Sequence, residues 1–154
     1  MVGEGKKYWS IGWETIFATR LKLGFVNAIG AEENLPLSER LYAGGEKSVR
    51  GYGRRKLGPR SAANDPIGGL SLFEGSLELR RPIWQALGGA LFVDFGQVSR
   101  RAFDLPLTNV KFAAGYGLSY ATPVGPVRVD IGFPFSPPRG DQAFQVHFSI
   151  GAAF

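Results

Sequence analysis

The sequence contains no cysteine and a single histidine, His147. Without thiols the chain can form neither a disulfide framework nor a thiolate metal site, and one histidine alone does not make a metal-binding constellation. No run of 18 apolar residues occurs, so the sequence predicts no transmembrane helix. No nucleophile elbow, phosphate-binding loop or closely spaced pair of acids stands out either. We therefore expect a protein that is not an enzyme and that needs no cofactor or metal.

The first residues lack the apolar h-region of a secretory signal peptide. If the protein is exported, we expect its signal to lie upstream of this sequence. The composition is rich in turn formers and aromatics, with 22 Gly, 10 Pro and 12 Phe in 154 residues, and this favours an all-β protein over a helical one.

The last ten residues alternate strictly between apolar and small or polar side chains. Every even position from Val146 to Phe154 is apolar, which is the period-two pattern of a β-strand. A soluble domain rarely ends on an alternating strand with a terminal Phe. A transmembrane β-barrel of the bacterial outer membrane typically does, because its final strand closes the barrel.

The same alternation recurs along the chain between turn-rich segments. It predicts strands over residues 17–25, 69–84, 89–98, 109–122 and 126–135. It can be traced back through Trp13, Ile11 and Trp9, which indicates either one long strand or two strands with an unclear break. Residues 1–16 are therefore treated as an N-terminal segment of uncertain structure, and residues 17–154 as the barrel region.

The connections alternate between tight turns and longer loops. The short turns are 85–88 and 123–126, and the long stretches are 31–67, 99–108 and 136–141. Outer-membrane barrels have short periplasmic turns and long extracellular loops. The sequence predicts an all-β, antiparallel transmembrane β-barrel with about seven to eight strands. A soluble sandwich would alternate similarly, but fewer charges would point at one interior.

Positive charge is concentrated in one part of the longest loop. The net charge is +5, and five cations lie between residues 50 and 60. A soluble β domain that binds nucleic acid through this cluster is one alternative. The membrane pattern elsewhere favours a solvated loop, so we expect no nucleic acid partner.

Four sequence motifs together resemble the Omp85 superfamily, the BamA/TamA-type outer-membrane assembly factors with a surface antigen D15 domain. The segment Gly-Gly-Glu-Lys-Ser-Val-Arg-Gly-Tyr at 44–52 resembles the Val-Arg-Gly-Phe/Tyr loop motif of that family. Residues 75–80, 92–96 and 145–154 resemble three of its strands, in the same order. Superfamily barrels generally have sixteen strands, so the resemblance implies that this chain corresponds to the C-terminal half of one.

The resemblance implies that the loop 31–67 folds back into the barrel lumen and that Arg50 meets Glu78 and Asp94. Alternation independently puts both acids on the polar faces of their strands. An arginine in a partly dry lumen needs carboxylate acceptors, and a carboxylate there needs a cation. The loop motif comprises Val49, Arg50, Gly51 and Tyr52.

The function implied is outer-membrane protein assembly, insertion or translocation without chemical fuel. It would use a weak seam between the first and last strands, whose exposed edge templates a client strand. The C-terminal side of that seam comprises Phe148, Ile150, Gly151 and Phe154. The expected partners are outer-membrane lipid and unfolded outer-membrane or secreted client polypeptides, together with a missing N-terminal barrel half, periplasmic domains or another copy.

Two alternatives remain within the membrane interpretation, which places the protein integrally in a bacterial-type outer membrane. The first is a polypeptide secretion pore or the membrane anchor of a fused effector. The second is a passive structural or adhesive barrel, for which replacing Arg50 would leave client assembly untouched.

Overall fold

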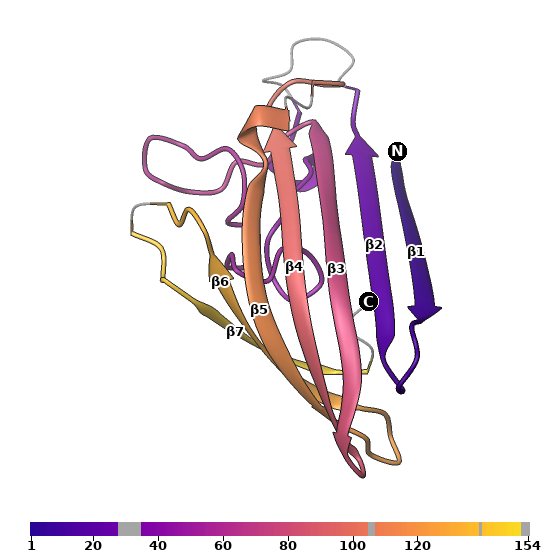
Figure 1. The fold of residues 1–154 in the computed structure, drawn as a ribbon. Helices are drawn as coiled ribbons and strands as arrows, with labels where there is room; N and C mark the ends of the chain where they lie inside the picture. Colours follow the sequence, from indigo (N-terminus) through magenta and orange to yellow (C-terminus); the bar gives the residue numbers. More distant parts are fainter. Residues whose placement is uncertain (28–34, 105–106, 139, 152–154) are drawn as a thin grey trace.

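The protein folds as one antiparallel sheet whose seven strands follow the order of the sequence (Figure 1). The computed structural model describes residues 1–27, 35–104, 107–138 and 140–151. The strands are β1 (Val2–Ser10), β2 (Ile16–Phe25), β3 (Ser71–Trp84), β4 (Leu87–Ser99), β5 (Lys111–Tyr120), β6 (Val127–Pro134) and β7 (Gln145–Ile150), and the 3-10 turns are η2 (Leu37–Glu39) and η3 (Leu107–Asn109). The all-β antiparallel prediction is confirmed.

The sheet is strongly curved, and residues 41–57, from the chain between β2 and β3, lie within the curve (Figure 1). Among the described residues, the outer edges of β1 and β7 pair with no other strand, so the sheet is open. No helix in this part of the chain is long and apolar enough to cross a membrane.

The two faces of the sheet differ in chemistry, because side chains alternate along each strand. On β3, Leu77 and Leu79 point to the convex face and are each 42% exposed, whereas Glu74 and Glu78 point to the concave face and are buried. The same division holds on β5, where Tyr116 and Leu118, two residues apart, line the convex face. An apolar convex face and a polar concave face are the arrangement of a strand wall that separates lipid from a lumen.

The alternation upstream of residue 17 belongs to two strands. The chain reverses at residues 11–15, where Gly12, Trp13 and Glu14 adopt φ values of 89°, 50° and 57°. Trp9 on β1 then lies opposite Phe17 on β2. The alternation did not reveal the start of β1 at Val2, because its outward positions include two glycines and a lysine rather than apolar residues.

The closing strand is shorter than predicted. β7 ends at Ile150, because Gly151 adopts a left-handed φ of 100° that interrupts the extended chain. The amide of Gly151 still donates to the carbonyl of Pro126 at 2.7 Å. The predicted final residues up to Phe154 lie outside the described part of the chain. Strand length falls from 14 residues in β3 to six in β7.

A small hydrophobic core joins the long loop to the concave face. Its members from the loop are Ala43, Val49, Tyr52 and Leu57, and those from the strands are Leu72, Val98 and Ala113. All seven are buried. This core holds residues 41–57 against the sheet and thereby positions Arg50 on the concave face.

Candidate functional site

Residues 44–52 form a compact turn that presents the arginine of the loop motif. Gly44 and Gly45 adopt φ values of 98° and 112°, which L-residues with a side chain rarely tolerate. The turn is closed by the amide of Gly45, which donates to the carbonyl of Tyr52 at 2.9 Å, and by the amide of Gly44, which donates to Ser48 Oγ at 2.9 Å. The motif is therefore a folded unit rather than an extended loop.

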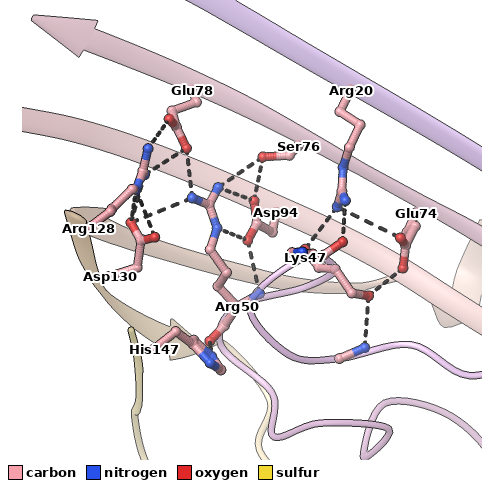
Figure 2. A network of polar contacts seen from close by, with 12 residues as sticks. Arg20, Lys47, Arg50, Glu74, Ser76, Glu78, Asp94, Arg128, Asp130 and His147 are labelled. Carbon is pink, nitrogen blue, oxygen red and sulfur yellow. Dashed lines mark hydrogen bonds and ion pairs between the residues drawn. The ribbon is translucent and has the colours of Figure 1, made fainter. Parts of the chain in front are cut away.

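Arg50 is buried at the centre of a polar network on the concave face (Figure 2). Its Nε and Nη2 donate to the two carboxylate oxygens of Asp94, each at 2.8 Å, and its Nη1 donates to Glu78 at 2.7 Å. Nη2 also donates to Ser76 Oγ at 3.0 Å. The backbone amide of Arg50 adds a bond of 2.9 Å to Asp94. This bidentate geometry ties the loop to β3 and β4 at once.

Further charged groups from β3 and β6 surround Arg50 and balance its acceptors. Arg128 donates to Glu78 and to Asp130, at 2.7 and 2.6 Å, and Arg80 is paired with Glu78. Three guanidinium groups therefore face three carboxylates, those of Glu78, Asp94 and Asp130. Isolated buried charges are costly, so each charged group in the cluster is matched by a partner of opposite sign.

Burial alone would lower the pKa of Arg50, but the hydrogen bonds and charges of Asp94 and Glu78 outweigh it and raise that pKa. Its guanidinium also lies over the ring of Phe92, 3.5 Å from the ring centroid. Phe92 is buried on the same strand as Asp94. A cation held over an aromatic face gains further attraction when water is excluded.

The backbone of the motif touches the backbone of β6, and glycine permits this on both sides. A Cβ placed on Gly132 would lie 2.6 Å from the carbonyl oxygen of Arg50. A Cβ placed on Gly51 would lie 2.9 Å from the amide nitrogen of Pro134. Neither contact can be relieved by rotating a side chain, because the opposing atoms belong to the main chain.

A second group of polar contacts holds the other side of the turn (Figure 2). Arg20 on β2 donates to the carbonyls of Lys47 and Ser48, the latter at 3.0 Å. The hydroxyl of Ser48 donates to the buried carboxylate of Glu74 on β3, which Lys22 approaches to 3.5 Å. The loop is thus bound to β2 and β3 as well.

The loop also reaches the last strands. The Nε2 atom of His147 lies 2.8 Å from the carbonyl oxygen of Arg50, and the hydroxyl of Tyr52 donates to the carbonyl of Ser136 at 3.3 Å. Through side chains and backbone together, residues 44–52 contact strands β2, β3, β4, β6 and β7.

Comparison with known proteins decides the family. A family model described as the Omp85 superfamily domain matches residues 1–154. The chain belongs to the Omp85 superfamily. It is 34% identical over 128 residues, or 79% of its length, to the "Outer membrane protein assembly factor BamA" of Nitratidesulfovibrio vulgaris. It is 32% identical over 65% of its length to the "Sorting and assembly machinery component 50 homolog" of Xenopus tropicalis.

The fold of this Omp85 chain is also found in a solved structure. The crystal structure of BamA from Haemophilus ducreyi lacking POTRA domains 1-3 has a TM-score of 0.76 at 23% identity, and the match covers 94% of this chain and 33% of that one. The chain spans 16% and 20% of the length of the two curated relatives. The sheet is thus part of the barrel of an integral outer-membrane protein.

The structure brings the motif and its expected acids together and adds residues that sequence reasoning missed. The added residues are Arg20, Ser48, Glu74, Ser76, Phe92, Arg128, Asp130 and, as a partner of the motif, His147. Alternation along the strand predicted at 126–135 places Arg128 and Asp130 on its polar face, and that signal could have identified them. Nothing local marked Ser48, whose role depends on the fold of the turn.

The remaining predicted residues lie elsewhere in this Omp85 chain. Phe148 and Ile150 are 61% and 69% exposed on the opposite face of β7 from His147. The five cations between residues 50 and 60 do not form one basic patch. Arg50 is buried, whereas Arg60 Nη2 lies 2.5 Å from a carboxylate oxygen of Asp141 in the 136–141 loop.

Proposed function

We propose that this Omp85 chain forms part of a barrel that assembles and inserts, or translocates, client polypeptides at the outer membrane without chemical fuel. The observation that carries the proposal is the buried Arg50 network, which fixes a loop inside the sheet instead of leaving the lumen open. The names of the relatives, an assembly factor and a sorting and assembly component, support the same function.

The loop acts as an internal brace for the sheet. It is bound through charged groups to strands β2, β3, β4 and β6, so the sheet keeps its curvature where the strands are long. β7 has only six residues, and its second edge pairs with no described strand. Unpaired backbone groups at such an edge can bind an incoming strand by β-augmentation.

In this proposal, the strand at the seam, β7, is held by a short set of backbone hydrogen bonds to β6, and the rest of the sheet is braced by the loop. Exchange of a client strand at this edge swaps one set of backbone hydrogen bonds for another, and this requires no nucleotide or other fuel. Phe148 and Ile150 would face lipid during the exchange. The turns at 85–86 and 123–126 would face the periplasm, from which the clients arrive.

The test is client assembly by the complete gene product in liposomes. An unfolded client barrel is added, and its folding is followed by the mobility shift between boiled and unboiled samples. Arg50→Gln removes the central cation, and Arg54→Gln is the matched control because Arg54 is an exposed cation of the same loop. We expect Arg50→Gln to slow assembly at least ten-fold and Arg54→Gln to leave it unchanged.

Folding of the variant barrel itself is checked by the same mobility shift. If Arg50→Gln does not fold, Ser48→Ala takes its place, since it removes the bond to Glu74 while keeping every charge. Wild-type assembly rates in a variant with a displaced loop would indicate a passive barrel. A client recovered inside the vesicle lumen, instead of in the membrane, would indicate a secretion pore.

A further inference from the structure

The convex face carries a groove at the end of the sheet where the short turns lie. It has a volume of about 420 Å³ and runs over β3, β4 and β5. Its walls are the apolar side chains of Leu79, Ile83, Leu91, Tyr116 and Leu118. Gly89 also lines the groove, beside the end of the Ile83 side chain. It lies outside the lumenal site, on the face that meets lipid.

One charged residue, Arg81, lines this mostly apolar groove, to which Thr15 adds a hydroxyl. It is exposed, and its side chain forms no hydrogen bond or ion pair with any residue that the structure describes. Glu14, from the nearby turn between β1 and β2, lines a neighbouring hollow together with Arg81 but is not paired with it. The cation is therefore available to a ligand.

The depth of Arg81 in the wall agrees with a position near the membrane interface. It precedes the end of β3 at Trp84 by three residues, which is about 10 Å at ~3.3 Å per residue. An arginine on the lipid face of a barrel is destabilising at the bilayer midplane and much better tolerated near the interface. Its long side chain can extend toward the headgroups while its methylenes stay among the apolar walls.

We propose that this groove binds one anionic phospholipid of the leaflet at the short-turn end. The apolar walls accommodate an acyl chain, and the Arg81 guanidinium donates to the phosphate. Arginine suits this role because its planar donors match two phosphate oxygens at once. A zwitterionic lipid carries its own cation beside the phosphate, so a lipid with net negative charge is favoured.

The proposal rests on the outer-membrane location and not on the assembly function. It is tested on the complete gene product, reconstituted in vesicles of equal parts phosphatidylcholine and phosphatidylglycerol. The protein is extracted in mild detergent, and the lipids that remain bound are identified by native mass spectrometry. We expect phosphatidylglycerol to be enriched about five-fold, since one arginine near an anionic surface contributes about 1 kcal/mol.

Two substitutions separate the headgroup contact from any general effect of charge. Arg81→Gln should abolish the enrichment. Lys7→Gln is the matched control, because Lys7 is another exposed cation whose register opposite Thr19 puts it on the convex face, over the Trp9 ring and away from the groove. It should leave the enrichment intact.

A third variant tests the groove itself. Gly89→Leu fills it while keeping Arg81, and a Cβ at this position meets only the movable end of Ile83, 2.8 Å away. We expect it to lose bound phospholipid of both kinds. The proposal is overturned if wild type shows no enrichment, if Arg81→Gln retains it, or if Lys7→Gln removes it equally. Absence of enrichment in the wild type overturns the proposal whether or not a variant folds.

Discussion

The imidazole Nε2 of His147 lies 2.8 Å from the main-chain carbonyl oxygen of Arg50. Arg50 therefore acts in two directions, since its side chain holds β3 and β4 while its backbone meets the last strand. Any shift of Arg50 would therefore change the hydrogen bond that connects the loop to His147 on β7. This relationship gives the proposed seam a measurable link to the lumenal loop.

Replacing His147 should loosen β7 without disturbing the central network. His147→Ala removes one hydrogen bond, which contributes about 1 kcal/mol. Amide hydrogen exchange of β7 should become about five-fold faster, while exchange in β3 and β4 stays unchanged. Ser149→Ala, at the next inward position of β7, serves as the control. Equal exchange rates in His147→Ala and wild type would show that β7 is held by its ladder alone.

Removing a carboxylate from the network should be strongly destabilising. Asp94→Ala leaves Arg50 without its bidentate acceptor, and loss of one partner of a buried pair costs about 3–5 kcal/mol. The double variant Arg50→Ala/Asp94→Ala should lose much less than the sum of the two single variants, because neither charge is then left unpaired. Urea unfolding in lipid vesicles measures all three. Simple additivity would contradict the contact.

Gly132 should be sensitive to the smallest substitution. In Gly132→Ala the new methyl group would meet the Arg50 carbonyl, and overpacking of this kind costs about 1–3 kcal/mol. Gly5→Ala is matched to it, since Gly5 also lies within a strand but nothing is within 4 Å of its added Cβ. Thermal unfolding should separate the two variants. Indistinguishable midpoints would mean that the loop backbone does not lie against β6.

The link between the two long loops should depend on pH. The hydrogen bond from Arg60 holds the pKa of the Asp141 carboxyl below its usual range. A lowered pKa stabilises the folded state above the unfolded value of about 3.9, and this contribution is lost as the pH falls through the lowered pKa. Because the pair is near the surface, its contribution is about 0.2–1 kcal/mol.

Hydrogen exchange of residues 57–66, corrected for intrinsic rates, follows this link. Protection should decline below about pH 3.9 in wild type. Asp141→Asn should lower protection at neutral pH and remove the decline, whereas Asp65→Asn, at an exposed carboxylate of the same loop, should behave as wild type. A pH profile of Asp141→Asn that matches wild type would exclude this pair as the cause.

Sequence alternation was sufficient for strands β2 to β6 and for the side of the sheet that Glu78 and Asp94 face. Glu78 and Asp94 could be placed on the lumenal face because a strand has a fixed period of two. The same argument could not place β1, whose outward positions include Gly3 and Lys7. It also could not show which lumenal groups meet. Arg20 and Ser48, for example, are far apart in the chain and come together only because the loop folds back against β2.

The span of the network along the chain has a consequence for the order of folding. Arg50 and Asp94 are 44 residues apart, and Arg50 and His147 are 97 apart. Contacts between such distant residues form late, because a long segment must first be ordered. The turn at 44–52 is closed by its own hydrogen bonds, but Arg50 meets Glu78 and Asp94 only when β3 and β4 are in place. We therefore expect folding to have a direction, in which the interior is filled before the final strand is added.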